Sequence, residues 1–300
     1  MAVFSLQVVP RNAAEWLDTA RRAEAAGFDT LLTPDHPGSC SSPFVALAAA
    51  AAVTTTIKLG SYVSNAGVRE PILLAGDVAT LDVVSGGRAV LGVGAGHTPA
   101  EWAAIGRTRP DVDGRVERCI AVAEATRRLL AGEEVTVDSP QLTMSAAKLT
   151  DPRPVQSHVP VLFGGGNRRL LRWAKDNADL IGLSGLGRTL PDGHTHEARW
   201  RPEQIDAQVE SLQGRTLEAL VQHIEISDDP DPALMERFGD TGLTADELRQ
   251  APYILAGTED EIVAAVREHR RRWGITRYAV RPPALDVLAP LLPRLTAEGS

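Results

Sequence analysis

The stretch "SNAGVREPILLAGDVATLDVVSGGRAVLGVGAG", from Ser64 to Gly96, contains the pattern that decides the fold. Its segment from Pro71 to Val84 is apolar, has the length of a helix and begins with proline, which is favoured in the first helical turn. The turn "SGGR" follows, and "RAVLGVGAG" is typical of a buried strand that ends in glycines. A buried helix followed directly by a buried strand predicts an α/β protein.

The same alternation continues on both sides of this stretch. We expect strands at residues 3–9, 29–35, 57–65, 88–96, 159–166, 178–185, 217–226 and 277–283. We expect helices at residues 13–26, 43–53, 71–84, 115–130, 168–175 and 259–273. Strands that are apolar on both faces and alternate with helices indicate a parallel sheet.

Eight such strands favour a closed (β/α)8 barrel, the TIM barrel, over a doubly wound open sheet, which is the alternative. No Pro-rich or Ser-rich linker divides the sequence, so we expect one domain over residues 1–300. The segment 132–150 is rich in β-branched and turn residues. We interpret it as an insertion after the fourth helix.

Composition excludes several classes of function. The formal net charge is -8 and no basic block occurs, which argues against nucleic acid as a partner. Cys40 and Cys119 lack the spacing of a disulfide framework or a zinc site. The longest apolar run, Phe44 to Val53, is shorter than the roughly 20 residues that cross a bilayer. Without a signal-like amino terminus, the sequence predicts a cytoplasmic protein that does not insert into membranes.

Asp35 and His36 are the first candidate functional residues, because they follow the second predicted strand and lie between Pro34 and Pro37. In a barrel of this kind the loops after the strands build the site. The flanking prolines restrict the backbone, so both side chains are presented with little freedom. The alternative is an Asp that caps a turn and a His that packs in a loop.

Two glycine-rich strand ends are the second candidates. Gly164, Gly165 and Gly166 lie between a strand and a helix, where backbone N–H groups can approach an anion. The run "LGVGAGHT", Leu91 to Thr98, is another such end. The spacing is not that of a dinucleotide fingerprint or a P-loop, and a plain turn is the alternative. Together the two ends favour a ligand with a phosphate group.

Two further pairs carry weaker signals. His194 and His196 have no acidic or cysteine partner placed beside them, so we favour a solvated loop over a metal pair and predict no metal site. Asp82 and Arg88 bracket "VVSGG", and we expect a structural ion pair that ties this turn.

The quoted stretch, together with "AEAAGFDTLLTPDH", "GRVERCIAVAEATRRLLAG", "DPRPVQSHVPVLFGGGNRRLLRWAKDNADLIGL" and "PYILAGTEDEIVAAV", resembles the luciferase-like family of flavin-dependent and deazaflavin-dependent oxidoreductases. The resemblance covers most of the chain. The segment "GGGNRRLLRWA" is most similar to the branch that uses the deazaflavin coenzyme F420. The resemblance implies a (β/α)8 barrel whose cofactor ring lies across the C-terminal mouth.

The resemblance also implies site residues. A bulge with a non-prolyl cis peptide is expected in the third strand, at Tyr62–Val63, with Ser64 and Asn65 beside the ring. Asp35 and His36 match positions that contact the ring edge and the substrate. The remaining cofactor-binding positions implied in this way are Ala95, Gly96, Thr98, Gly164, Gly165, Gly166, Asn167 and Arg168.

His97 departs from the family pattern, because some relatives that use the deazaflavin carry a carboxylic acid there as proton donor. A histidine can also donate a proton, since its ordinary pKa is near neutrality. We therefore include His97 with His36 and Asp35 among the catalytic candidates.

The leading hypothesis is an oxidoreductase that transfers a hydride between coenzyme F420 and a small organic substrate. The alternative is a monooxygenase that uses reduced FMN from a separate reductase. The third is a cofactor-binding barrel without catalysis. We also expect a homodimer.

Overall fold

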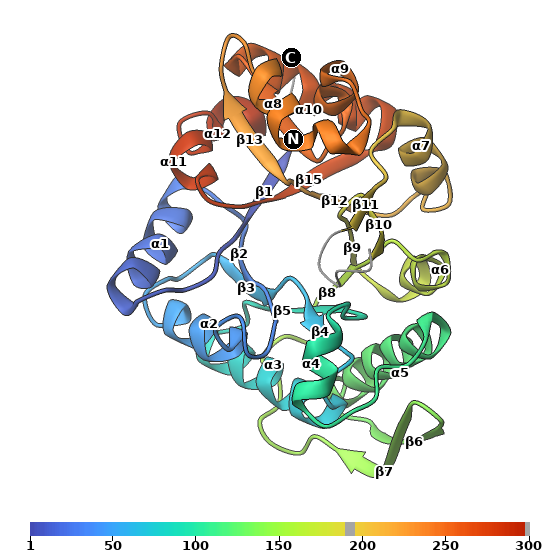
Figure 1. Cartoon of the computed structure of the whole chain (residues 1–300). Coiled ribbons are helices and arrows are strands. Elements are labelled where there is room, and N and C mark those ends of the chain that lie inside the picture. The colour runs from blue at the N-terminus through green and yellow to red at the C-terminus, as the bar shows by residue number, and fades with distance from the viewer. Residues whose placement is uncertain (190–195, 298–300) are drawn as a thin grey trace.

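The structure is a computed structural model that describes residues 1–189 and 196–297. Parallel strands form a ring at its centre, and helices surround the ring (Figure 1). In chain order the eight strands of the ring are β1 (Val3–Gln7), β2 (Thr30–Thr33), β3 (Lys58–Ser61), β5 (Ala89–Gly94), β8 (Val161–Gly164), β9 (Leu180–Leu183), β12 (Leu217–Leu220) and β15 (Ile275–Val280).

The ring is closed, which confirms the predicted (β/α)8 barrel over the open sheet. Strand β15 pairs with β1, and β3 pairs with β5 through Leu59 and Ala89, so no edge is left unpaired. After a two-residue interruption, the chain of β3 continues as β4 (Ser64–Asn65), which also pairs with β5. The peptide bond between Tyr62 and Val63 in this bulge is cis.

The helices cover the outside of the ring. They are α1 (Ala13–Ala26), α2 (Pro43–Ala51), α3 (Pro71–Ser85), α5 (Val112–Leu130), α6 (Arg168–Asn177), α7 (Pro202–Glu210), α10 (Glu259–Trp273), α11 (Ala284–Leu288) and α12 (Leu292–Thr296). A large hydrophobic cluster joins helices and strands, and a small second cluster includes Leu32, Tyr62 and Leu220. Within the described residues, no helix has the length and apolarity needed to cross a membrane.

Several elements lie outside the regular alternation. The segment predicted as an insertion contains a hairpin of β6 (Glu134–Ser139) and β7 (Leu142–Lys148). Helix α4 (Pro99–Ala104) follows β5, and β10 (Leu186–Thr189) pairs with β11 (His196–Ala198). The last third adds α8 (Asp231–Phe238), the 3-10 turn η1 (Gly239–Thr241) and α9 (Ala245–Gln250).

The prediction of one strand over residues 217–226 was wrong. The chain forms β12 and then a separate strand, β13 (His223–Ile226). Strand β13 leaves the ring and pairs in parallel with β14 (Ile254–Gly257), a strand that the sequence pattern did not predict. An apolar run shows that a segment is buried, but the partner of the segment depends on residues far away in the chain.

The predicted ion pair between Asp82 and Arg88 was also wrong. Asp82 is fully buried, and its carboxylate accepts hydrogen bonds from the backbone N–H groups of Ala89, Val155 and Gln156. The Arg88 guanidinium instead donates to backbone carbonyls near the end of α2 and to Ser85. Backbone N–H groups thus bind the Asp82 carboxylate, backbone carbonyls bind the Arg88 guanidinium, and the two side chains do not pair with each other.

A glutamate inside the barrel provides a test of the fold. Glu218 of β12 is fully buried, accepts a hydrogen bond from the Ser5 hydroxyl at 2.9 Å, and lies 3.7 Å from the Arg277 guanidinium. Burial raises its pKa to about 7. The folded protein therefore holds a proton that the unfolded chain releases at lower pH.

Because the pKa is raised on folding, the associated stability is present at acidic pH and is lost as the pH rises through about 7. We expect Glu218→Gln, which is neutral at every pH, to remove this loss. Between pH 5 and pH 8 the variant should gain on the order of 3 kcal/mol in unfolding free energy relative to the parent. Urea unfolding at both pH values measures it. If the unfolding free energies of variant and parent differ by the same amount at pH 5 and pH 8, the raised pKa of Glu218 is contradicted.

Candidate active site

A cavity of about 810 Å³ lies at the carboxyl ends of the barrel strands. Its wall takes residues from the ends of all eight strands, including Gln7, the last residue of β1, and Leu220, the last residue of β12. The predicted site residues that line this cavity are Asp35, His36, Tyr62, Val63, Asn65, Ala95, Gly96, His97, Gly164, Gly165, Gly166 and Asn167. Residues separated by more than 100 positions in the sequence therefore share one cavity.

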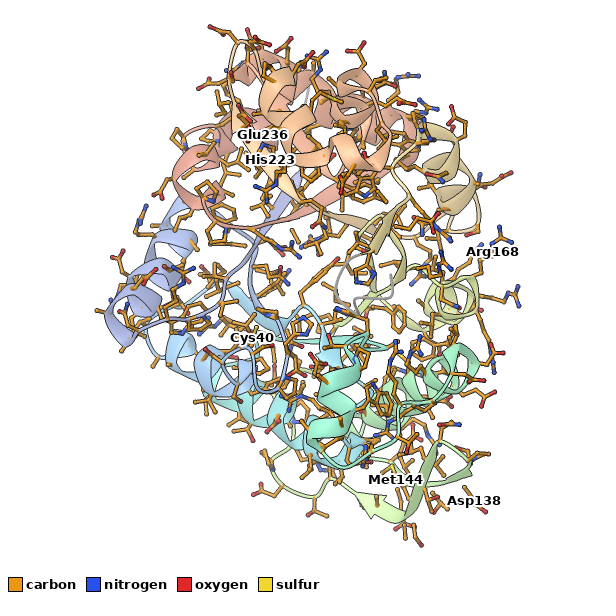
Figure 2. All side chains as sticks on the ribbon, in the orientation of Figure 1. Cys40, Asp138, Met144, Arg168, His223 and Glu236 are labelled. Carbon is orange, nitrogen blue, oxygen red and sulfur yellow. The ribbon has the colours of Figure 1, made fainter. Side chains whose placement is uncertain are left out.

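Three predicted residues lie elsewhere. Ser64 is fully buried, and its hydroxyl is 2.6 Å from that of Ser61. Thr98 is buried at the start of α4. Arg168 begins α6 and is exposed at the outer edge of the molecule (Figure 2).

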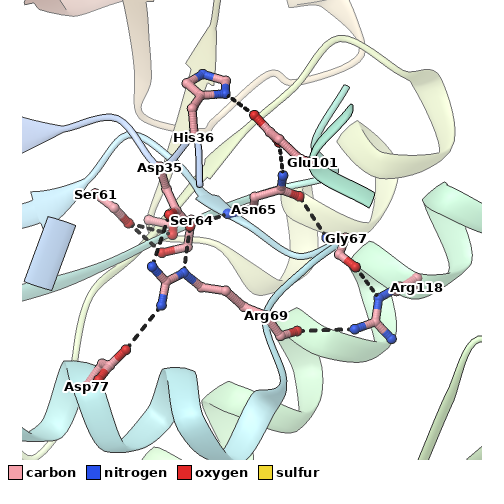
Figure 3. A network of polar contacts seen from close by, with 11 residues as sticks. Asp35, His36, Ser61, Ser64, Asn65, Gly67, Arg69, Asp77, Glu101 and Arg118 are labelled. Carbon is pink, nitrogen blue, oxygen red and sulfur yellow. Dashed lines mark hydrogen bonds and ion pairs between the residues drawn. The ribbon is translucent and has the colours of Figure 1, made fainter. Parts of the chain in front are cut away.

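His36 is held by a glutamate that sequence reasoning missed. Its Nδ1 lies 2.7 Å from Oε1 of Glu101, a residue of α4 with 4% exposure (Figure 3). This hydrogen bond is the main cause of a raised pKa of His36, against the opposing effect of burial. Among the described residues, none forms a hydrogen bond with Nε2 of His36.

The only sequence signal for Glu101 was an acidic residue in the first turn of a helix, which ordinarily indicates helix stabilisation. Its second carboxylate oxygen accepts a hydrogen bond from the Asn65 side chain at 2.5 Å. One buried carboxylate therefore orients both His36, after β2, and the side chain of Asn65, at the end of β4 (Figure 3).

Asp35 has its oxygens occupied by neighbours. Arg69 donates to both of them, from Nε at 2.6 Å and from Nη2 at 2.9 Å, and the backbone N–H of Asn65 donates at 2.9 Å. Asp35 is 4% exposed, and Arg69 also reaches Asp77 at 3.2 Å. A bidentate, buried pair of this kind fixes geometry. Asp35 thus ties the loop after β2 to the residues after the bulge (Figure 3).

Three imidazole rings follow one another across the mouth. The ring centroids of His36 and His97 are 5.5 Å apart, and those of His97 and His196 are 4.8 Å apart. His196 lines the cavity, in place of the solvated loop that we expected. His194 lies outside the described residues. Among those that are described, no group of three or more potential metal ligands is found.

The bulge between β3 and β4 is packed against glycines. A Cβ added at Gly94 or Gly164 would lie 2.5 or 2.9 Å from the Val63 side chain, and one at Gly182 would lie 2.1 Å from the Tyr62 hydroxyl. Such distances do not occur between real atoms, so only glycine allows these strands to approach the bulge. The Gln7 amide donates to the Tyr62 carbonyl at 2.6 Å and holds the bulge from β1.

The amino end of α6 offers backbone donors to the cavity. The side chain of Asn167 caps the helix and accepts from the N–H groups of Arg169 and Leu170. The N–H groups of Gly166, Asn167 and Arg168 have no acceptor within the described ranges. Free N–H groups at a helix amino terminus are a binding site for anions.

Comparisons with known proteins agree with this geometry. The model of the family described as luciferase-like monooxygenase matches residues 2–203. An uncharacterised protein of Mycobacterium tuberculosis is 33% identical over 185 residues, which are 53% of this chain and 64% of that protein. The chain thus spans less than two thirds of the length of this relative.

Two proteins of named activity are also similar. The F420-dependent glucose-6-phosphate dehydrogenase of Kineococcus radiotolerans is 29% identical over 271 residues, covering 85% of this chain and 77% of that protein. The solved structure of the coenzyme F420-dependent tetrahydromethanopterin reductase from Methanopyrus kandleri covers 98% of this chain and 99% of its own, with a TM-score of 0.76 and 20% identity. With two thirds of its residues matched by the family model, the chain belongs to the luciferase-like monooxygenase family.

Proposed function

We propose that the protein is an oxidoreductase that transfers a hydride between coenzyme F420 and a small organic substrate. The observation that carries the proposal is a single cavity wall that joins a free helix amino terminus, a glycine-packed bulge and His36. The similarity to an F420-dependent dehydrogenase over 85% of the chain supports the choice of cofactor.

The residues present fit a tricyclic cofactor with a phosphate group. The volume of about 810 Å³ is within the range of cofactor sites. Val63 of the bulge lines the cavity, so a flat ring can lie against it, and the N–H groups of Gly166 and Asn167 can receive the phosphate. When bound, the cofactor supplies the hydride chemistry.

His36 is the proposed proton donor and acceptor for the substrate. The Glu101 carboxylate accepts a hydrogen bond from Nδ1–H of His36, so Nε2 can carry a second proton and deliver it to a substrate atom in the cavity. The raised pKa keeps more of this imidazole protonated near neutral pH. In this proposal Asp35 and Asn65 position the reacting groups, because their polar atoms are already bonded to the protein. His97 remains a candidate for exchanging the proton with solvent.

The second candidate function is a monooxygenase that uses reduced FMN, favoured by the name of the family whose model matches. A barrel that binds a cofactor without catalysis is the third. Binding and turnover separate the three. A protein that binds either cofactor but never exchanges a hydride would support the third.

The cofactor preference is the direct test. We expect the apo protein to bind the deazaflavin more tightly than FMN in parallel titrations in one buffer. The N–H groups of Gly166 and Asn167 form the proposed phosphate cradle. The oligoglutamate tail of the deazaflavin adds negative charges, and Arg168 and Arg169 follow this cradle at the start of α6. Arg168→Ala or Arg169→Ala should narrow the preference and weaken its dependence on salt.

Arg172→Ala is the matched control, because Arg172 lies one turn further along the same helix and is also exposed. Equal or tighter binding of FMN by the parent protein would favour the monooxygenase. Arg169 lies 3.4 Å from Glu117, so the Arg168 variant tests the tail contact with the least disturbance of the protein.

Two predictions about partners go with this function. Helices α2 and α3 are neighbours and expose Val45, Leu73 and Val84 by 73%, 67% and 54%. Large apolar side chains exposed on adjacent helices favour contact with a second copy, which supports the predicted homodimer. Sedimentation velocity distinguishes the monomer from the dimer.

A separate reductase is required only by the monooxygenase alternative.

A further inference from the structure

A cationic side chain in the cavity wall has no counter-ion among the described residues. Arg281 follows β15 and is exposed to the cavity. Its Nε donates to the side-chain oxygen of Gln7 at 2.8 Å, and its Nη1 donates to that of Gln222 at 2.9 Å. Both partners are neutral amides. In the described part of the chain, Arg281 forms no ion pair with a carboxylate.

Arg69 and Arg118 (Figure 3) have carboxylate partners, whereas Arg11, which also lines the cavity, forms no ion pair with a described residue. Arg69 has Asp35, and Arg118 has Glu70 at 3.0 Å. Taking a guanidinium out of bulk water without an opposite charge is costly, and this desolvation lowers the pKa of Arg281. The two glutamines fix the position of the guanidinium but do not neutralise it.

The chemistry of the guanidinium indicates the missing ligand. A guanidinium has five N–H donors, of which Gln7 and Gln222 use two, so three remain. A planar fork of such donors matches a carboxylate, which it binds through two parallel hydrogen bonds. Among the described residues, two carboxylates line the cavity. Asp35 is bonded to Arg69, Glu15 accepts a hydrogen bond from the Asn12 side chain, and neither forms an ion pair with Arg281.

The position of Arg281 separates it from the phosphate cradle. Strand β15 is three strands away from β8 around the ring, with β9 and β12 between them. Gln7 bonds both Arg281 and the carbonyl of Tyr62, so the guanidinium lies next to the bulge residues. Its charge also acts on His36, where it opposes part of the effect of Glu101 on the pKa. A ligand on Arg281 therefore lies on the reacting side of the cavity.

We propose that Arg281 is a specificity-determining residue and that the substrate is an organic acid whose carboxylate binds this guanidinium beside His36. That the bound acid is a substrate rests on the proposed function, but binding of an anion to Arg281 does not depend on the cofactor. Gln7 and Gln222 orient the guanidinium, and the rest of the acid extends toward Nε2 of His36.

Benzoate and benzamide are matched probes, because they have the same shape and differ in charge. Protein with bound oxidised deazaflavin is titrated with each, and cofactor fluorescence reports binding. We expect the parent protein to prefer benzoate at least tenfold, and Arg281→Gln to lose this preference while its affinity for benzamide and for the cofactor stays within threefold. Arg281→Lys should retain part of the preference, since it keeps the charge and loses the fork.

Arg11→Gln is the control, because Arg11 also lines the cavity and is exposed. It should leave benzoate binding within threefold. The proposal is overturned if the parent does not distinguish the two probes, a result that needs no variant to fold. It is also overturned if Arg11→Gln is as damaging as Arg281→Gln, or if Arg281→Gln weakens cofactor binding tenfold, which would assign the guanidinium to the cofactor.

The same titration on apo protein, followed by calorimetry, separates this proposal from the proposed function. Binding of benzoate that depends on Arg281 in a protein that binds no deazaflavin would support the anion site and contradict the F420 assignment. Tight deazaflavin binding without preference for benzoate would support the F420 assignment and contradict the anion site.

Discussion

His36→Ala should lower turnover by about 10²-fold to 10⁴-fold, the usual contribution of a positioned general acid or base. The affinity for the cofactor should stay within about tenfold, because the imidazole acts on the reacting centre and the cradle on α6 is untouched. Turnover is followed as the change in deazaflavin absorbance with a substrate found by screening carbonyl compounds, organic acids included.

His158→Ala is the control for this variant. His158 is 59% exposed and lies before β8, at the opposite end of the barrel, where it pairs with Asp179 at 2.8 Å. We expect its turnover to match the parent. Glu101→Gln adds a second readout, because losing the carboxylate should lower the pKa of His36, the proposed proton donor, and shift the alkaline limb of the pH profile to lower pH. Full activity in His36→Ala would remove this residue from the mechanism.

Asp35→Ala should cost about 3–5 kcal/mol of unfolding free energy, the range for breaking a buried ion pair by removing one partner. The side chain of Asp35 is 2% exposed, and its loss leaves Arg69 without its bidentate partner and the Asn65 N–H without an acceptor. Urea unfolding measures the change.

Asp77→Ala is the matched control, because Asp77 contacts the same Arg69 at 3.2 Å from a position that is 43% exposed. An exposed pair contributes at most about 1 kcal/mol. A loss in Asp35→Ala that is no larger than in Asp77→Ala would show that the pair does not support the site. Because Asp35 holds the backbone after the bulge, we also expect weaker cofactor binding in its variant.

Local pattern in the sequence was sufficient for the order of the elements. The alternation of apolar strands and helices predicted the eight strands of the ring, and the helix predicted at residues 13–26 has the bounds of α1. Burial on both faces leaves a signal in every segment, because each strand must be apolar wherever it meets the core. The glycines at the ends of β5 and β8 could be located for the same reason, since close approach of strands requires them within a short stretch.

The polar part of the site could be found only in part from the sequence. His36 was identified by its position after a strand, but its partner Glu101 lies 65 residues further on and resembles an ordinary helix-start residue. Arg281 and Gln7 are 274 residues apart and meet because β15 closes the ring against β1. No local sequence pattern predicts contacts between residues so far apart in the chain.

By itself, the sequence determined which segments are buried, where strands end and which backbone positions must be glycine. These are properties of one segment in its own surroundings, and each leaves a periodic or local mark. Tertiary structure alone decided which ionisable groups share the cavity and which cations lack a partner. Arg69 and Arg281 are the same residue type, yet closure of the barrel places one against Asp35 and the other against two neutral amides. Charge compensation depends on distance in space, so only the folded chain distinguishes them.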